Sequence, residues 1–539
     1  MTAKNGQPIF QHHQPKNAAP SYPNAPQNLG KSTAVVSFFT LISRILGLMR
    51  DAVLMAVFGA SGLMDAFLVA FKLPNFLRRL FAEGAFAQAF VPVLTDYQQK
   101  STFSDLQQFI SRMAGALLLI LSLLSTAVIA FAPWIMAVFA VGFSKDSEQF
   151  RLTVQLFQLT FPYLLLITLT AFASSILQSY QRFIIPAITP IILNVCLIVF
   201  ALCISPALYQ PILALGYAVL LAGVLQLLLQ CVPIYQQKLL ILPKLDWQHQ
   251  GVRQVLKLLL PAIFGVSVLQ INLLLNTVIA TFLPTGSVSW LYTAERMSEL
   301  PLGLIGVAIG AVILPTLSRQ VNSDDSQSLQ RTLDWACKWV LLVGLPASVA
   351  LVQISQVLMF TLFVRGEFGR QDATMSGLAL QAMSLGILPF MLIKVFAPVF
   401  FAQKNSRIPV KWGLWSVLAN GLFGLTLLLI FWYQGVALHI SLALATSLSA
   451  WVNAVGLYCS LQKRRIFSFA KPWRALALRF LLANLAMSVA LQWLLPLFPL
   501  SANQASKILA LLAICVAGAV VYAVALLLSG FKINWLKYG

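Results

Sequence analysis

Residues 43–51 read Ser43-Arg44-Ile45-Leu46-Gly47-Leu48-Met49-Arg50-Asp51 and lie inside an apolar run, 33–59, that is long enough to span a bilayer. An Arg or Asp at the centre of a membrane helix costs about 2.5 to 3.5 kcal/mol on insertion scales. A membrane helix that keeps such charges needs them for a polar function. The stretch therefore indicates a helical bundle with a solvated pathway for a substrate or an ion.

Two further apolar segments carry charges in the same way. In the second segment, a helix would place several polar side chains on one stripe about 80° wide. They are Asp65, Lys72, Asn75, Arg79 and Glu83, and Arg78 lies off the stripe. In the eighth segment, a similar stripe holds Ser289, Arg296, Glu299 and Gly303. Three charged helix faces predict a polar cavity inside the bundle.

The composition places the chain in a membrane. It has 539 residues, of which 59% are hydrophobic and 9% are charged, whereas soluble domains average roughly 25% charged residues. Apolar runs of spanning length recur along the chain, which predicts an all-α, polytopic membrane protein. The net charge of +21 does not indicate nucleic acid, because Lys and Arg gather in short loops, where topology and anionic lipid headgroups account for them.

Fourteen apolar segments are long enough to span. Basic residues concentrate in the even-numbered loops, as at Arg182 and Lys463-Arg464-Arg465, and the odd-numbered loops carry few. By the positive-inside rule, both termini lie in the cytoplasm. The predicted transmembrane helices are 33–59, 63–95, 108–140, 152–178, 184–205, 209–235, 253–283, 288–318, 331–363, 373–403, 409–433, 437–461, 474–496 and 505–529.

A faint internal repeat with an offset close to 224 residues relates the two halves of the chain, so that Asp65 and Lys72 correspond to Ser289 and Arg296. Each half holds six spans, so the copies have the same orientation and are related by an axis along the membrane normal. The expected parts are a disordered cytoplasmic tail at 1–30, an N-lobe at 31–237, a basic cytoplasmic linker at 238–252, a C-lobe at 253–465, and two further helices with a C-terminal tail at 466–539.

The intramembrane charges have a second interpretation, in which they neutralise one another and only hold helices together. The pairs would be Arg44 with Asp51, Arg79 with Glu83, and Arg296 with Glu299. Basic residues outnumber acids in the first helix, however, and Arg50 has no evident local partner. A cationic cavity for an anionic substrate fits this excess, because Arg makes bidentate contacts with phosphate oxygens.

The sequence contains no catalytic constellation: it has no Walker A motif, no metal-ligand spacing and no Ser-His-Asp grouping. The six cysteines show no C-x-x-C spacing, so we expect free thiols and no metal site. We expect neither enzymatic activity nor a cofactor. An ATP-driven pump would need a partner that supplies the ATPase.

Motifs from both halves of the chain carry a resemblance to a known family. In the first half they are residues 43–51, Asp65-Ala66-Phe67, Phe71-Lys72-Leu73-Pro74-Asn75, Arg78-Arg79 and Phe81-Ala82-Glu83-Gly84-Ala85-Phe86. In the second half they are Gly286-Ser287-Val288-Ser289, Glu295-Arg296, Glu299, Leu314-Pro315, Lys394-Val395 and Ala397-Pro398. With these motifs the chain resembles the MurJ (MviN) family of lipid II flippases over nearly everything after residue 30.

The resemblance implies the fold of the multidrug/oligosaccharidyl-lipid/polysaccharide exporter superfamily, with two six-helix lobes in a V and two extra helices that form a lipid-facing groove. It implies the bacterial inner membrane and a role in peptidoglycan synthesis and cell shape. The implied partners are lipid II, membrane lipids and proteins of cell-wall synthesis.

The resemblance and the repeat together assign site residues. Substrate binding falls to Arg44, Arg50, Arg296, Arg78 and Arg79. Gating or ion pairing falls to Asp65, Ser289, Glu83, Glu299, Lys72 and Lys394, and a hydrogen bond between Asp65 and Ser289 would close the periplasmic side. Some relatives bind sodium with acidic residues of helices 7, 11 and 12. Here those helices offer Asn272, Asn276, Asn420 and Asn453 but no carboxylate, so we expect no strong sodium site.

These observations predict a transporter that moves the lipid-linked peptidoglycan precursor from the cytoplasmic to the periplasmic leaflet by alternating access. The arginines would hold the diphosphate while the undecaprenyl tail stays in lipid. Three alternatives stay open at this point. They are another oligosaccharide-lipid flippase, a cation-coupled drug exporter, which should have an acidic cavity, and a non-transporting scaffold for cell-wall assembly.

Overall fold

The computed structural model describes residues 29–80, 86–322, 325–403, 405–469, 472–499 and 503–532. Within these ranges the chain is helical, and its β-structure is limited to one isolated bridge between Arg365 and Phe368. The predicted all-α fold is confirmed.

The helices follow one another with short connections. Their bounds are α1 Leu29–Phe58, α2 Gly62–Leu80, α3 Phe86–Lys100, α4 Phe103–Ala130, α5 Ala132–Phe139, α6 Glu148–Thr160, α7 Tyr163–Ser179, α8 Ile184–Val199, α9 Leu213–Gln236, α10 Gln250–Ala280, α11 Ser287–Asn322, α12 Ser326–Phe363, α13 Arg370–Ser384, α14 Ile387–Ala402, α15 Arg407–Gln434, α16 His439–Lys463, α17 Pro472–Leu494 and α18 Gln504–Leu528.

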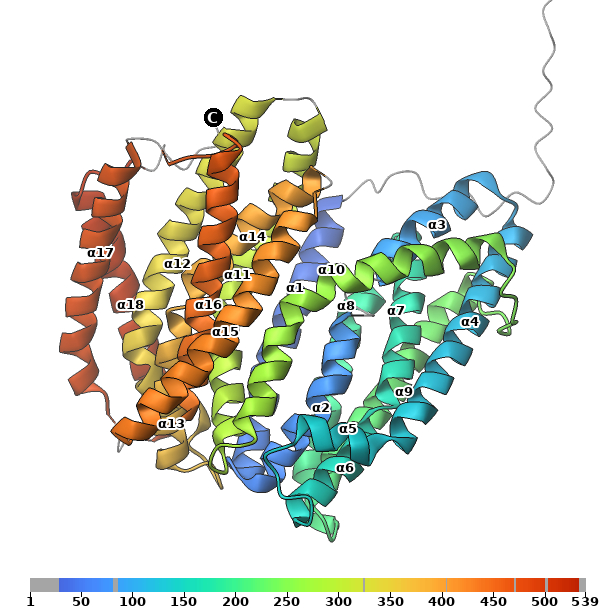
Figure 1. Cartoon of the computed structure of the whole chain (residues 1–539), viewed down its shortest axis with the longest axis horizontal. Helices are drawn as coiled ribbons and strands as arrows, with labels where there is room; N and C mark the ends of the chain where they lie inside the picture. Colours follow the sequence, from blue (N-terminus) through green and yellow to red (C-terminus); the bar gives the residue numbers. More distant parts are fainter. Residues whose placement is uncertain are drawn as a thin grey trace, which may run out of the picture.

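The helices form two groups, which α10 joins (Figure 1). In the first group, α1 to α9, α1 packs against α8, α2 against α6, and α7 against α9. In the second group, α11 to α16, α15 packs against α16, α12 against α13, and α11 against α14. The pair α17 and α18 packs on α12, at the left edge of Figure 1.

Three of the predicted spans are each divided into two helices: 108–140 into α4 and α5, 152–178 into α6 and α7, and 373–403 into α13 and α14. The predicted span 63–95 contains α2 and α3, and residues 81–85 between them lie outside the described ranges. Two of the breaks fall beside Pro133 and Pro162, since proline cannot donate the backbone hydrogen bond that would continue a helix. At Gly386 the axes of α13 and α14 bend by 41°.

Within the described ranges, nine helices are long and apolar enough to cross a membrane, or ten if the bent pair α13 and α14 is one span. The predicted spans outside these ten correspond to α1, to α2 with α3, to α10 and to α11. Of these, α1, α2 and α11 carry the charged motifs. The total of fourteen spans stays a prediction.

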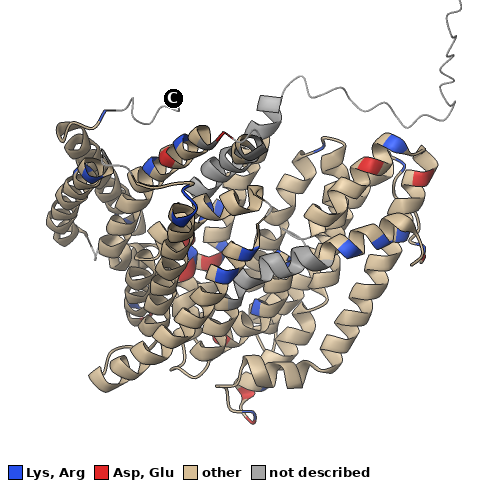
Figure 2. Ribbon diagram, turned by 45° about the horizontal axis from the view of Figure 1, so that its top comes forward, with Lys and Arg blue, Asp and Glu red and all other residues tan. Residues whose placement is uncertain are grey.

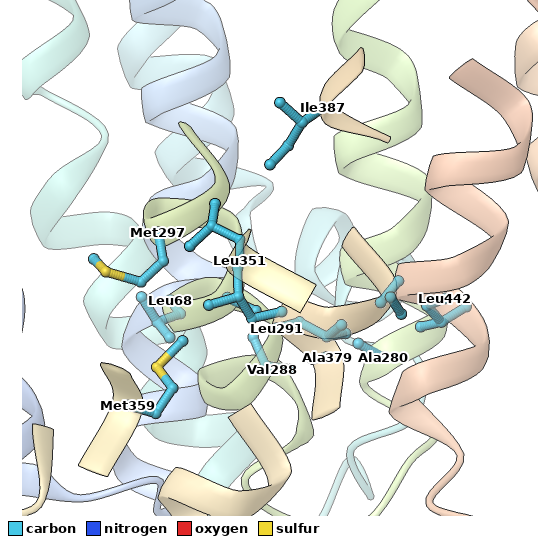
Figure 3. Packing of buried hydrophobic residues seen from close by; sticks show 14 of the residues in the cluster. Leu68, Ala280, Val288, Leu291, Met297, Leu351, Met359, Ala379, Ile387 and Leu442 are labelled. Carbon is cyan, nitrogen blue, oxygen red and sulfur yellow. The ribbon is translucent and has the colours of Figure 1, made fainter. Parts of the chain in front are cut away.

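Buried apolar side chains also connect the two groups. In Figure 3, Leu68 of α2 lies in one cluster with Val288, Leu291 and Met297 of α11 and with Leu351 of α12. Because lipid tails are as apolar as these side chains, close packing rather than a hydrophobic driving force holds such a contact together in a bilayer.

The connection between the groups is anchored on α4. The backbone N–H of Lys244 donates to the carbonyl of Ser111 at 3.1 Å, and the hydroxyl of Ser111 donates to the carbonyl of Leu242 at 2.6 Å. Gly115 permits this approach, because a Cβ there would overlap the backbone of Lys244. The helix α10 then begins against α3 and α4, and it also packs against α15 and α16 of the second group.

Candidate functional site

A cavity of about 660 Å³ lies between the two groups, with walls from α1, α2, α7 and α8 on one side and from α10, α11, α14 and α16 on the other. Figure 2 shows one group of basic and acidic residues near the centre of the bundle, and others near the helix ends. Among the described residues, six basic and two acidic side chains line the cavity. The basic ones are Arg50, Lys72, Arg78, Arg79, Arg296 and Lys394, and the acidic ones are Glu295 and Glu299.

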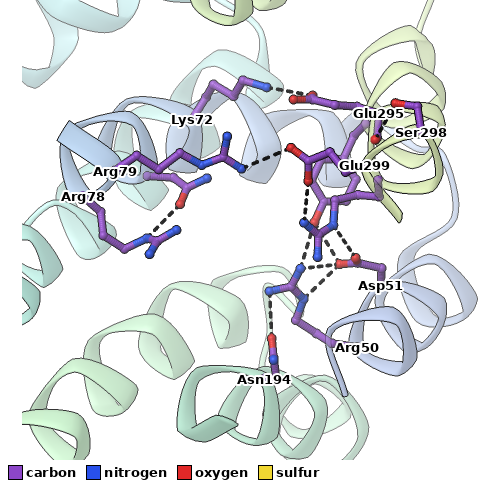
Figure 4. Close-up of polar contacts among 12 residues, drawn as sticks. Arg50, Asp51, Lys72, Arg78, Arg79, Asn194, Glu295, Ser298 and Glu299 are labelled. Carbon is purple, nitrogen blue, oxygen red and sulfur yellow. Dashed lines mark hydrogen bonds and ion pairs between the residues drawn. The ribbon is translucent and has the colours of Figure 1, made fainter. Parts of the chain in front are cut away.

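Asp51 of α1 joins the two groups beside the cavity. Its carboxylate is 1% exposed and accepts hydrogen bonds from Nη2 of Arg50 at 2.6 Å and from the Tyr292 hydroxyl at 2.8 Å. Its second oxygen accepts from Nε of Arg296 at 2.9 Å. Arg50 also donates from Nη1 to Asn194 of α8 at 3.1 Å (Figure 4). One carboxylate of the first group thus holds guanidinium groups from both groups.

Ion pairs between α2 and α11 extend this network (Figure 4). Nη1 of Arg296 donates to Glu299 at 3.1 Å, as predicted, and the other oxygen of Glu299 lies 3.6 Å from Nη2 of Arg79. Lys72 donates to Glu295 at 3.2 Å. Three ion pairs therefore join the two groups: Asp51 with Arg296, Arg79 with Glu299, and Lys72 with Glu295.

The remaining predicted residues lie at different places. Nε of Arg78 donates to Asn75 at 3.0 Å, and Nζ of Lys394 donates to the carbonyl of Leu302 at 3.3 Å. Both basic side chains line the cavity. Glu83 lies outside the described residues.

The predicted pair of Arg44 and Asp51 is wrong, as is the expectation that Arg50 lacks a partner. Asp51 pairs instead with its neighbour Arg50 and with Arg296 across the cavity. Residues seven apart on a helix are separated by about 10 Å along its axis, so closer partners prevail. The Arg44 guanidinium lies against Gly303 of α11, where a Cβ would overlap it, and Arg44 is not among the residues that line the cavity.

Asp65 lies in the first turn of α2, directly after the end of α1, and it bonds to α11 of the second group. Its carboxylate is 2% exposed and accepts from the Ser289 hydroxyl at 2.6 Å and the Ser289 N–H at 2.9 Å. The N–H of Gly286 donates to its other oxygen at 2.7 Å. Gly286 has a φ of +94, which glycine adopts readily, and this conformation directs its N–H toward Asp65. The predicted hydrogen bond between Asp65 and Ser289 is present.

Asparagines of α10, α15 and α16 form a neutral polar cluster. Nδ2 of Asn276 donates to Thr446 at 2.7 Å, and Nδ2 of Asn420 donates to Oδ1 of Asn276 at 2.8 Å. The Oδ1 atoms of Asn272, Asn420 and Asn453 are buried without a hydrogen-bond partner among the described residues. Over the same ranges, no three His, Cys, Asp or Glu side chains gather that could hold a metal ion.

Two side chains of the network were not predicted from the sequence. Asn194 interrupts the apolar segment 184–205, and a lone amide in such a segment is a signal that could have found it. Tyr292 gives no such signal, because a tyrosine in a membrane helix commonly packs as an aromatic side chain.

Comparison with known proteins identifies the family. The family model described as lipid II flippase MurJ matches residues 54–512. The chain belongs to the MurJ family.

Relatives in the MurJ family align over almost their full lengths. A protein of Haemophilus influenzae named probable lipid II flippase MurJ is 39% identical, over 92% of this chain and 98% of the relative. A protein of Burkholderia cenocepacia named lipid II flippase MurJ is 36% identical, over 95% of this chain and 99% of the relative.

Solved structures place this MurJ-family chain among known folds. A lipid II flippase MurJ in an inward closed conformation superposes with a TM-score of 0.75 at 26% identity, over 91% of this chain and 98% of the other. A multidrug resistance MATE family transporter in an inward-facing conformation superposes with a TM-score of 0.65 at 13% identity, over 80% of this chain and 98% of the other, and shows the fold alone. The chain is a multi-pass membrane protein.

Proposed function

We propose that this chain is a lipid II flippase, which carries the undecaprenyl-diphosphate-linked peptidoglycan precursor across the bacterial inner membrane. The observation that carries the proposal is the shared carboxylate of Asp51, which holds Arg50 of one group and Arg296 of the other in the cavity wall. In the part of the chain that the structure describes, this cavity is lined by six basic and two acidic side chains. Such a lining favours an anionic ligand over an organic cation.

The ion pairs around the cavity are exchangeable. Because the side chains of Arg296, Glu299 and Arg79 are 26 to 36% exposed, the pairs that Glu299 forms with Arg296 and with Arg79 each contribute only about 1 kcal/mol or less. Phosphate oxygens can replace the carboxylates, because guanidinium binds both with the same planar fork. Gly47 of α1 lies against Nη2 of Arg296, and a Cβ at Gly47 would lie 3.4 Å from this nitrogen.

The membrane orientation follows from the loop charges. With the basic loops and both termini in the cytoplasm, the end closed by Asp65 faces the periplasm, and the cavity takes up its substrate from the cytoplasmic side. The parts 31–237 and 253–465 rock against each other as lobes, while α17 and α18 offer a lipid-facing surface to the undecaprenyl tail. Transport of this kind requires neither a catalytic residue nor a cofactor.

The membrane potential supplies the driving force for the return step in this proposal. Among the described residues, the asparagine cluster lacks the carboxylate that a hard cation such as sodium requires. One charge that crosses the full field is worth about 2.3 kcal/mol per 100 mV. A periplasm that is positive would draw the empty cationic cavity toward the cytoplasm and would favour outward movement of the anionic headgroup.

The test measures lipid II in each leaflet after depletion of the native flippase. Arg50→Ala and Arg296→Ala are expected to abolish flipping although the proteins insert and fold, and the Lys variants to restore it only in part. Arg44→Ala is measured in the same series, because Arg44 is the third arginine that the sequence predicts to bind the substrate. The exposed Arg407→Ala serves as the matched control and should flip at the unaltered rate. Full complementation by both Arg50→Ala and Arg296→Ala would overturn the proposal.

A further inference from the structure

Two glycines outside the charged network bring the backbones of the two groups together. Gly142 lies in the loop between α5 and α6, and its N–H donates to the hydroxyl of Thr281, the residue that caps α10, at 3.0 Å. A Cβ on Gly142 would overlap the backbone of Thr281. Only a residue without a side chain therefore permits this contact.

Gly366 makes the corresponding contact in the loop between α12 and α13. A Cβ on Gly366 would overlap the carbonyl oxygen of Ala56 in the last turn of α1, and the N–H of Glu367 donates to that same oxygen at 2.9 Å. Gly366 also has a φ of +54, which disfavours any residue with a side chain. The loop thus lies on the end of α1 as the other loop lies on the end of α10.

The two contacts are related by the internal repeat. Gly142 and Gly366 are 224 residues apart, the same separation as between Asp65 and Ser289. Their targets, Ala56 and Thr281, are 225 apart. Gly142 of the first half touches the end of α10, which is the first helix of the second half. Gly366 of the second half touches the end of α1, which is the first helix of the first half. The pair therefore has the two-fold arrangement that parallel repeats produce around an axis along the membrane normal.

We propose that Gly142 on Thr281 and Gly366 on Ala56 form two equivalent clasps that flank the bond between Asp65 and Ser289 and complete the closed end of the cavity. Each clasp is a pair of positioning residues for transport, which hold the closed state without contact to the substrate. The assignment of this end to the periplasm rests on the proposed function. The two contacts themselves do not depend on the proposed function, because they are close approaches between backbone atoms.

Equivalence of the clasps has a functional consequence. An added methyl group in either contact must be accommodated by separation of the two groups, because the opposing atoms are backbone. Overpacking of a well-fitted contact shifts the balance toward the open state by about tenfold. Either substitution should therefore open the same end of the cavity, although one changes the first group and the other changes the second.

The experiment follows entry of a membrane-impermeant maleimide into the cavity from outside the cell. The reporter is Leu291→Cys, a cavity-lining position that is buried in the closed structure. Gly142→Ala and Gly366→Ala are each expected to raise its labelling rate by about tenfold. The control for added bulk is Gly421→Ala, and the control for a positive φ is Gly435→Ala, because no described residue has an atom within 4 Å of a Cβ at either position.

Two further variants keep the proposal falsifiable if an alanine variant does not accumulate. Thr281→Val removes the acceptor hydroxyl at nearly constant size and should raise labelling without steric strain. The cysteine pair Ala56→Cys with Glu367→Cys should cross-link, and the bond should abolish labelling of the reporter and block transport reversibly. Labelling that stays at the level of the controls in Gly142→Ala, Gly366→Ala and Thr281→Val would overturn the proposal. Because labelling reports closure and not cargo, this result is distinct from failure of the lipid II assignment.

Discussion

Removal of the negative charge of Asp51 tests whether the shared carboxylate holds the two groups together. Asp51→Asn preserves the size of the side chain but leaves Arg50 and Arg296 next to each other without their common anion. Loss of one partner from a buried ion pair costs about 3 to 5 kcal/mol. Since Arg296 is 30% exposed, we expect the lower end, about 3 kcal/mol.

This free energy sets the expected change in conformation. The bond from Arg296 to Asp51 crosses between the groups, so separation of the groups breaks it. A loss of about 3 kcal/mol reduces the ratio of closed to open molecules about 100-fold. Distances between spin labels on α2 and α11, measured in nanodiscs, would show a second, longer population in Asp51→Asn, and flipping in a depleted strain would fall.

The matched control is Asp96→Asn, which makes the same chemical change in an exposed pair. Asp96 is 55% exposed and lies 3.0 Å from Lys100, so its removal should cost less than about 1 kcal/mol. If the two variants give the same label distances and both support growth, Asp51 does not hold the groups together and the reasoning is refuted.

Three further predictions concern the gate, the cavity and the driving force. The pair Asp65→Cys with Ser289→Cys should cross-link and lock transport until reduced, and free labelling of both thiols throughout the transport cycle would contradict this gate. Gly47→Leu should lower flipping by crowding Nη2 of Arg296, whereas Gly47→Ala, whose Cβ would lie 3.4 Å away, should not. Equal rates for the two variants in the leaflet assay would contradict a role for the position of Arg296 in flipping. Collapse of the membrane potential should slow flipping in proteoliposomes while replacement of sodium leaves it unchanged, and a strict sodium requirement would decide against a potential-driven return.

The sequence could predict the helices that carry the site, because charge in an apolar run is costly and therefore informative. Lys72 and Arg296 were identified in this way, as was the bond between Asp65 and Ser289, which follows from equivalent positions in a repeat. The family resemblance added the expectation of a diphosphate ligand. These predictions depend on periodicity along one helix or on comparison between halves.

The partners of the charges could not be predicted in the same way. A helical wheel gives the direction of a side chain but not the helix that faces it, so Arg44 was assigned to Asp51, which in fact binds Arg50 and Arg296. The breaks within predicted spans also depend on how neighbouring helices accept a proline or a glycine, as at Pro162 and Gly386.

The division of α10 between the two groups limits where the chain can be cut. Val252, Val255 and Leu259 of α10 belong to a hydrophobic cluster whose other members come from α3, α4, α7 and the end of α9. A gene split in the loop at 237–249 would give an N-terminal fragment that lacks these three side chains and exposes the surface they cover. Two such fragments can assemble only when α10 of the second inserts into the first, so fragment complementation in this protein would resemble the docking of a helix into a preformed groove.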